Sequence, residues 1–474
     1  MKWETVIGLE VHAELSTRSK IFCGCSTAFG GEPNIYVCPV CAGMPGSLPK
    51  LNRTVVEYAV RTGLALGCTI TRHTRFDRKN YFYPDLPKAY QVSQLYAPVC
   101  RGGGMEIEAG GAAKPIRLRE IHMEEDAGKL VHDAGNITQM DFNRCGVPLL
   151  EIVTQPDFQN AAEALAFLEK LRETLLYLGV SDGKMQEGSL RADVNLSLRR
   201  PGGELGVRTE MKNLNSFKAV SRAIHWETAR QTDILESGGR IEQETRRWDD
   251  DRGESYGMRS KENAPDYRYF PEPDLLPVVI DDAWLARIQA GIPELAHEKR
   301  ARYQAEYGLT EKEAGILTRH LNMARLFETL AQKTGEPLEA AHMLTGDIMR
   351  LMNAASVPPE EIKTDAGKLA ALISLLTDKK INRTAYKETL EAVFLRGADP
   401  ETYIRENNLM IIGDADTVAG AVSAVIAENP DAAADYQNGK EKAFGFLVGK
   451  TMKRLGGAAN PGTVREMLEK LLKG

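Results

Sequence analysis

Three side chains that bind metal ions or transfer protons recur at alternate positions near the N-terminus. In residues 5–15 the odd positions are mostly apolar, while the even positions include Glu10, His12 and Glu14. A β-strand sends alternate side chains to opposite faces of a sheet, so these three groups are expected to share one face. A solvated strand face of mixed polar residues would show the same pattern. Two carboxylates beside an imidazole also suit a divalent-cation site, and this strand alone leaves both interpretations open.

A second pair of carboxylates lies on two strands that a turn is expected to join. Residues 190–198 alternate between apolar and polar, with Asp193 on the polar face. A turn at residues 201–203 predicts a hairpin that places Asp193 roughly across from Glu210, about 5 Å away. Two like charges at that distance repel each other unless a cation or a proton separates them. A surface lattice of ion pairs is the alternative, and its cations would be Arg191, Arg208 and Lys212.

Acidic residues also gather at an expected strand end and inside an apolar run. Glu124 and Glu125 belong to three consecutive acids, which break strand alternation and indicate a strand end or a bulge. Glu151 lies in an apolar run, where burying an unpaired charge is costly, so it requires a metal or a partner such as Arg144. Carboxylate-rich sites suit Mg²⁺ or Mn²⁺, which most often bridge phosphates in phosphoryl transfer. Ligation by His12 would favour Mn²⁺ or a second ion, and the sequence leaves this open.

Four of the seven cysteines form two close pairs. Cys23 and Cys25 are separated by one residue, and Cys38 and Cys41 by two. Two pairs of thiolates joined by a short loop match the tetrahedral geometry of zinc. We therefore expect a structural zinc knuckle over residues 23–41. A closed shell of four sulfur ligands has no open position, so its role would not be catalytic.

Length and composition restrict the class of protein. A chain of 474 residues with a net charge of −6 and 43% hydrophobic residues is typical of a soluble protein of two to four domains. The mild negative charge argues against indiscriminate coating of nucleic acid. No apolar run is long enough to cross a bilayer, and the first residues carry no apolar signal segment. We therefore expect a cytoplasmic protein with no membrane partner.

The pattern of elements divides the chain into three regions. Residues 1–293 alternate strand patterns with Gly-rich turns and contain two helices, expected over about 157–179 and 215–239. Residues 294–398 and 399–474 show helical periodicity almost throughout. The sequence therefore predicts an α+β fold, in which a mixed-sheet N-terminal domain is followed by an all-helical domain and a small helical tail domain.

Nucleotide binding would have to proceed without a familiar phosphate-binding loop. Residues 445–451 place three residues between their glycines where a P-loop has four, and they lie in a helical pattern. Cations interleaved with aromatic side chains are the better candidates, because they can neutralise phosphate and stack on a base. A rigid surface loop is the alternative. The candidates in segments 77–91 and 244–274 are Arg78, Lys79, Tyr81, Tyr83, Lys88 and Arg246.

Several of these segments match one known family in order along the chain. They resemble the B subunit of the aspartyl/glutamyl-tRNA amidotransferase, and the resemblance covers essentially the whole chain. The matching stretches are residues 6–12, 78–85, 122–129, 187–191, 212–216 and 266–274.

This resemblance implies a ligase component that depends on ATP and Mg²⁺. The N-terminal region would be the family's cradle domain, which phosphorylates the side-chain carboxylate of Glu or Asp misacylated onto tRNA(Gln) or tRNA(Asn). Ammonia from the partner amidase, the A subunit, would then displace the phosphate and give the amide. The small C subunit would complete the heterotrimer, and the helical domains would bind the tRNA. A non-catalytic tRNA-binding adaptor and a metal-dependent nuclease are the alternative functions.

The resemblance also implies roles for the acidic residues. They would act as metal ligands rather than as acid–base catalysts, because the substrate carboxylate must be activated by ATP. The implied ligands are Glu10, His12, Glu124, Glu125, Glu151, Asp193 and Glu210. Four of these are expected to be required for catalysis, namely Glu10, His12, Glu125 and Glu151.

Overall fold

The chain divides into two compact units, Met1–Leu295 and Ala296–Gly474. The sequence places this boundary at residue 293. The computed structural model describes residues 3–134, 137–260, 264–411, 415–456 and 459–473.

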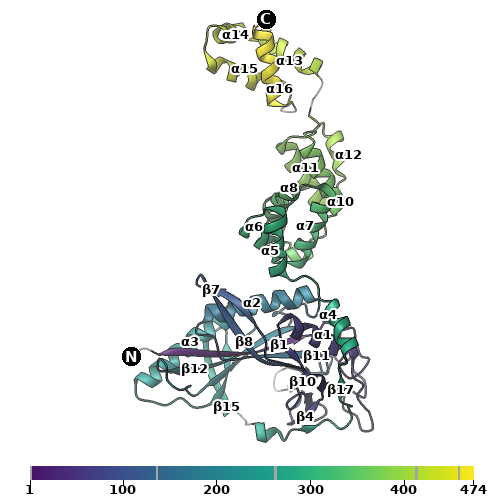
Figure 1. The fold of residues 1–474 in the computed structure, drawn as a ribbon, viewed down its shortest axis with the longest axis vertical. Helices are drawn as coiled ribbons and strands as arrows, with labels where there is room; N and C mark the ends of the chain where they lie inside the picture. The colour runs from purple at the N-terminus through teal and green to yellow at the C-terminus, as the bar shows by residue number, and fades with distance from the viewer. Residues whose placement is uncertain (1–2, 135–136, 261–263, 412–414, 457–458, 474) are drawn as a thin grey trace. The chain divides into compact units, whose positions relative to one another are not determined.

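A ten-stranded mixed sheet forms the centre of the first unit (Figure 1). Its long strands β12, β1, β11 and β8 are each antiparallel to their neighbours in that order, whereas β13 and β14 pair in parallel. In spatial order the strands are β15 (Glu254–Ser260), β14 (Glu244–Asp249), β13 (Thr209–Lys212), β12 (Leu190–Arg199), β1 (Glu4–Glu14), β11 (Pro148–Thr154), β8 (Ala112–Glu125), β6 (Cys100–Arg101) and β2 (Thr69–Ile70), and β7 (Gly104–Ala109) pairs with β8.

Three helices pack against this sheet and against one another. Helix α1 (Arg53–Ala65) contacts β8, α3 (Phe217–Glu236) contacts β12, and α2 (Ala161–Leu178) contacts both other helices. Figure 1 shows α2 and α3 along the sheet. Helix α2 begins after the N-cap Asn160 and ends at Gly179, whose φ of 66° is the left-handed conformation that glycine adopts without strain.

Strand β1 has the two faces that its sequence predicts. Ile7, Leu9 and Val11 are at most 1% exposed. Leu9 lies opposite Val194 of β12, the strand against which α3 packs, so the apolar face of β1 is on the helix side. Burial of such side chains contributes about 1.5 to 3 kcal/mol each, which holds the register of β1 and leaves Glu10 and its polar neighbours on the other face.

Smaller β-elements bring distant segments of the first unit together. Strands β16 (Phe270–Pro271), β4 (Asp77–Asn80) and β5 (Tyr90–Ser93) form a three-stranded sheet in that order. The segment around residue 80 therefore lies beside the segment around residue 270. The remaining elements are β3 (His73–Thr74) with β17 (Val278–Val279), β9 (Lys129–Ala134) with β10 (Ile137–Asp141), the 3₁₀ helix Ala264–Tyr267 and α4 (Asp282–Ala290).

The second unit is built from helices that surround two apolar cores. One core extends from Tyr303 to Ile404, and the other from Val418 to Leu472. Because Ile404 belongs to the first core, the second core begins later than the boundary that the sequence places at residue 399. The helices are α5 (Ala296–Tyr307), α6 (Glu311–Thr318), α7 (Leu321–Thr334), α8 (Pro337–His342), a π-helix (Met343–Ile348), α9 (Met349–Ala355), a 3₁₀ helix (Pro359–Glu361), α10 (Ala366–Thr377), α11 (Arg383–Arg396), α12 (Pro400–Glu406), α13 (Ala415–Glu428), α14 (Pro430–Gln437), α15 (Glu441–Arg454) and α16 (Pro461–Lys473).

This architecture confirms the predicted α+β fold, with a mixed sheet in the N-terminal unit and helices after it. Among the described residues, none of the helices combines the length and the apolar composition needed to span a bilayer.

Candidate functional site

The first cluster takes one side chain from each of three neighbouring strands. His12 lies on β1, opposite Glu151 of β11, and Glu124 lies on β8. The Nε2 atom of His12 is 3.4 Å from Oε1 of Glu124 and 3.5 Å from Oε2 of Glu151. One ligand atom from each residue lies within 4.8 Å of the others. We call this group the His12 cluster. Opposed side chains on antiparallel strands are about 5 Å apart, so the sheet itself assembles the group.

His122 supports this cluster, although it is not among the ligands that the sequence predicts. Its Nε2 atom is 2.8 Å from Oε2 of Glu151, the residue directly opposite on β11. Within the described residues, its buried Nδ1 atom has no hydrogen-bond partner. A signal was available in the sequence, because His122 and Glu124 are two residues apart and so share a strand face.

Burial and the carboxylates act in opposite directions on the imidazoles of this cluster. Burial lowers the pKa of His12, but Glu151 and then Glu124 outweigh it and raise this pKa to about 9. Burial raises the pKa of Glu151, yet His122 and His12 bring it well below its ordinary value. The ionised carboxylate of Glu151 therefore lies between the imidazoles of His12 and His122. A divalent cation that binds His12 must displace the proton from its imidazole.

The second cluster consists of Glu10, Asp193 and Glu210, whose ligand atoms also lie within 4.8 Å of one another. We call it the acidic cluster. Glu10 lies opposite Asp193, whereas Glu210 lies opposite Asn195, so the predicted opposition of Asp193 and Glu210 is wrong by two residues. The expected turn forms, with the Gly203 N–H donating to the Arg200 carbonyl at 2.8 Å. Residues 203–208 that follow it form no strand, and this longer connection shifts the pairing.

A lysine lies within the acidic cluster. The Nζ atom of Lys212 is 2.6 Å from Asp193 Oδ2 and 3.2 Å from Glu210 Oε1. The Asn195 amide donates to Glu10 Oε1 at 3.0 Å. Burial, followed by the charges of neighbouring carboxylates, still raises the pKa of Glu10. The ion-pair alternative is thus realised by Lys212, and the remaining repulsion at Glu10 is what an added cation would relieve.

A third group lies at the end of β1, and the sequence patterns do not predict it. Asp126 Oδ2 pairs with Arg191 at 2.7 Å and with Arg144 at 3.3 Å. Burial, then the neighbouring Asp126, raises the pKa of Glu14 to about 8, and the two side chains are hydrogen-bonded. The sequence offers Arg144 as a partner of Glu151, but its side chain is taken by Asp126 and by the carbonyl oxygens of residues 127 and 128. The even positions of β1 therefore serve three separate clusters.

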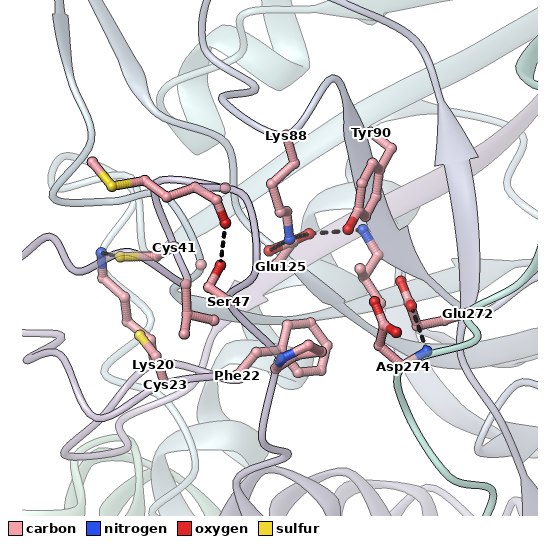
Figure 2. A pocket seen from close by; sticks show the side chains of 16 residues that line it. Lys20, Phe22, Cys23, Cys41, Ser47, Lys88, Tyr90, Glu125, Glu272 and Asp274 are labelled. Carbon is pink, nitrogen blue, oxygen red and sulfur yellow. Dashed lines mark hydrogen bonds and ion pairs between the residues drawn. The ribbon is translucent and has the colours of Figure 1, made fainter.

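Glu125 belongs to a cavity and not to the His12 cluster. It follows Glu124 on β8, and successive strand residues point to opposite faces. Oε2 of Glu125 accepts from the Lys88 ammonium at 2.7 Å, and Oε1 accepts from the Val92 N–H at 2.8 Å. This ion pair lines a cavity of about 140 Å³ whose other wall includes Cys41 (Figure 2). The structure therefore does not bring Glu125 together with the other expected ligands.

The aromatic segments expected to bind ATP do converge near the His12 cluster. Burial, and then Glu124, raises the pKa of both Tyr81 and Tyr269. The Lys79 ammonium is 4.9 Å from the centre of the Tyr267 ring, and the Tyr81 and Tyr267 rings meet edge to face. Long-range strand pairing between β4 and β16 produces this arrangement.

The other expected ATP contacts are differently placed. The Arg78 guanidinium already donates to Glu272 at 2.7 Å and to Asp274 at 3.0 Å. Tyr83 is 55% exposed. Arg246 donates to Ser255 at 2.8 Å and lies over Trp226 of α3, so its side chain is on the helix side of the sheet, away from the acidic cluster.

The four paired cysteines come together as one group, which we call the tetracysteine cluster. Cys41 Sγ is 4.0 Å from the sulfur of Cys25 and 3.9 Å from that of Cys38, and all four sulfurs lie within 4.8 Å. Zinc–sulfur bonds of about 2.3 Å in a tetrahedron imply sulfur–sulfur distances of about 3.8 Å. A hydrogen bond with Cys23 lowers the pKa of Cys41 to about 4, against the effect of burial. All seven cysteines of the chain lie in described residues and none forms a disulfide.

Comparison with known proteins gives one consistent result. Residues 5–286 match the model of the GatB/GatE catalytic domain, and residues 325–472 match that of the GatB domain. The chain is 55% identical over 472 residues to a protein of Lachnoclostridium phytofermentans, with 99% of each chain covered. It is 54% identical to a protein of Caldicellulosiruptor bescii and 50% identical to one of Thermoanaerobacter, with all of each chain covered. All three relatives are named as the B subunit of aspartyl/glutamyl-tRNA(Asn/Gln) amidotransferase. With matches of this extent, the chain belongs to the family of aspartyl/glutamyl-tRNA(Asn/Gln) amidotransferase B subunits.

Proposed function

We propose that the N-terminal unit uses ATP and Mg²⁺ to activate the side-chain carboxylate of Glu or Asp carried on tRNA(Gln) or tRNA(Asn), and then converts it to the amide. The observation that carries this proposal is the convergence of the His12 cluster and the acidic cluster on the polar face of β1. Membership of the amidotransferase family supports it.

The reaction needs ATP because a carboxylate is a poor acyl donor, having no good leaving group. Attack of a carboxylate oxygen on the γ-phosphorus of ATP forms an acyl phosphate and releases ADP. Ammonia then attacks the acyl carbon, the carbon–nitrogen bond forms, the carbon–oxygen bond to phosphate breaks, and the nitrogen loses a proton as phosphate leaves. Magnesium, when bound, offsets the repulsion between the anionic carboxylate and ATP.

Each cluster contributes to this chemistry in a different way. His12, Glu124 and Glu151 would hold one cation, with His122 orienting Glu151 as outer-shell partners of metal ligands do. Glu10, Asp193 and Glu210 would hold a second. Tyr81 lies near Glu124 of the His12 cluster and offers a π-face that suits a base. The Lys79 ammonium lies over the Tyr81 ring and offers a cation that suits a phosphate. Arg246 is outside this proposal because it lies on the helix side.

Partners and a structural metal complete the proposal. Ammonia would come from an amidase, the A subunit, and the small C subunit would complete the complex; the relatives' designation as B subunits supports an assembly of this kind. The helical unit would bind the tRNA, and the complex would act in the cytoplasm, where aminoacyl-tRNA is used. The tetracysteine cluster would hold structural Zn²⁺, which its sulfur–sulfur distances support.

The experiment is an assay of the full-length chain assembled with its partner proteins. ATP hydrolysis and amide formation are measured with Glu-tRNA(Gln) and with Asp-tRNA(Asn). We expect tRNA-stimulated ATP hydrolysis in the wild type and its loss in Glu124→Gln. Glu108→Gln, at an exposed glutamate of β7, is the matched control and should be fully active.

Two outcomes would overturn the proposal. A non-catalytic tRNA adaptor would bind tRNA without any stimulated ATP hydrolysis, and Glu124→Gln would then behave like the wild type. A metal-dependent nuclease would instead degrade the tRNA when given Mg²⁺ without ATP.

A further inference from the structure

Lys20 is fully buried beside the tetracysteine cluster. Its ammonium donates to the carbonyl oxygen of Tyr36 at 2.7 Å and to that of Phe142 at 3.2 Å, and it lies 3.6 Å from Sγ of Cys41. These three acceptors use the three donors of an ammonium group. Within the described part of the chain, Lys20 forms no ion pair with a carboxylate.

This environment is unusual for a lysine. A buried charge is costly unless an opposite charge and hydrogen bonds compensate it. The two carbonyl groups supply hydrogen bonds, but they carry no net charge. The third acceptor is the sulfur of Cys41, so the group in direct contact with the ammonium that can carry a compensating negative charge belongs to the tetracysteine cluster.

A zinc site with four thiolates carries a charge of this sign. Four thiolates and one Zn²⁺ sum to a net charge of −2, because each ligating cysteine is deprotonated. One ammonium in contact with a ligand sulfur halves this charge. The buried lysine and the tetrathiolate site therefore remove each other's electrostatic cost.

We propose that Lys20 is the counter-ion of the tetracysteine zinc site, and that its charge determines how tightly the metal is retained. This inference rests on the structural zinc proposed above. Lys20 is a positioning residue here, since it acts on the metal through Cys41 and through the loop that carries Tyr36.

The same lysine connects the zinc knuckle to the wall of the cavity that contains Glu125. Lys20 and Cys41 line one side of this cavity, and Lys88 and Glu125 line another (Figure 2). Gly146 packs against them with a φ of 82°, and a Cβ there would lie 3.5 Å from Cδ of Lys20. Its N–H donates to the Asp126 carbonyl, next to Glu125, at 2.9 Å. Lys20 therefore lies between the tetracysteine cluster and the backbone that forms this wall.

The test compares variants of the full-length chain. Lys20→Met removes the charge with little change in volume. Lys20→Gln keeps a donor for one carbonyl without the charge, and it replaces Lys20→Met if that variant fails to fold. Lys50→Met is the matched control, because it makes the same change at an exposed lysine of the same segment. Zinc content is measured by mass spectrometry, and zinc release by the rate of transfer to a chromogenic chelator.

We expect the wild type and Lys50→Met to retain one zinc per chain with slow transfer. Removing outer-shell partners of metal ligands lowers metal affinity by about 10- to 100-fold. If faster dissociation accounts for this loss, transfer from Lys20→Met and Lys20→Gln should be faster by about the same factor. In the cobalt-substituted protein, the thiolate-to-cobalt band of the Lys20 variants should move to longer wavelength, since a sulfur without the ammonium donates charge more easily. A purely structural role of Lys20 would leave the position of this band unchanged.

Equal transfer rates in Lys20→Gln and the wild type would overturn the inference, as would equal acceleration in Lys50→Met. Absence of zinc from the purified wild type would overturn it together with the structural zinc. Neither result bears on the amidotransferase proposal. That proposal is tested separately, by comparing tRNA-stimulated ATP hydrolysis in the wild type and in Glu124→Gln.

Discussion

Replacing Glu14 with glutamine should stabilise the N-terminal unit at alkaline pH. Burial, followed by Asp126, raises the pKa of Glu14 from 4.5 to about 8, against the effects of Arg191 and Arg144. An acid with a raised pKa binds more protons in the folded chain than in the unfolded chain. Its contribution to stability is therefore complete below pH 4.5 and is lost as the pH rises to 8. At about 1.4 kcal/mol per pH unit, this loss amounts to at most about 5 kcal/mol.

The Glu14→Gln variant isolates this effect. Glutamine keeps an N–H donor toward Asp126 but cannot ionise, so the gain in unfolding free energy over the wild type should increase steadily between pH 5 and pH 8. Urea unfolding followed by tryptophan fluorescence measures this gain for the N-terminal unit. All four tryptophans of the chain precede residue 295, namely Trp3, Trp226, Trp248 and Trp284. Glu32→Gln makes the same change at an exposed site and should show no such trend. A difference between Glu14→Gln and the wild type that stays constant from pH 5 to pH 8 would refute the reasoning.

Three further predictions concern other parts of the site. Glu151→Gln should lower the Mn²⁺ affinity of the full-length chain by about 100-fold or more, because even outer-shell partners contribute about 10- to 100-fold to metal affinity. An unchanged Mn²⁺ titration would count against the His12 cluster as a metal site. Lys88→Met leaves Glu125, which is 3% exposed, without its cation and should lower the unfolding free energy by about 3 to 5 kcal/mol. The double variant Lys88→Met with Glu125→Gln should recover part of this loss in the same urea assay, and no recovery would contradict the ion pair. Gly146→Ala forces a left-handed alanine at a φ of 82° and should cost about 1 to 2 kcal/mol by urea unfolding, where a neutral result would contradict the strain.

The sequence predicts the faces of the strands better than their partners. The alternation of β1 correctly places Glu10 and His12 on one polar face, because hydrophobic periodicity is local and burial enforces it. Which acids meet across strands depends on register, and register depends on loop length. The unpaired residues 203–208 move Glu210 from Asp193 to Asn195, a shift that no pattern within either strand encodes.

Other features depend on contacts between residues far apart in the chain. Tyr81 and Tyr269 both lie near Glu124 only because β4 pairs with β16, nearly 200 residues later, and propensity gives no measure of such pairing. Lys20 looks like any surface lysine in the sequence, since only the folded knuckle buries it. By contrast, the cysteine spacing is enough to predict that four sulfurs gather, because these ligands are close in sequence and the loop between them is short.

Strand β1 supplies one member to each of three groups at steps of two residues. Glu10 belongs to the acidic cluster, His12 to the His12 cluster, and Glu14 to the group around Asp126. A point substitution can therefore alter one cluster and leave the other two in place. A deletion or insertion of a single residue has a different effect, because it exchanges the two faces of the strand and removes all three groups at the same time. Substitutions in this segment can thus be tolerated one at a time during evolution. Its length cannot change, because the positions of Glu10, His12 and Glu14 all depend on it.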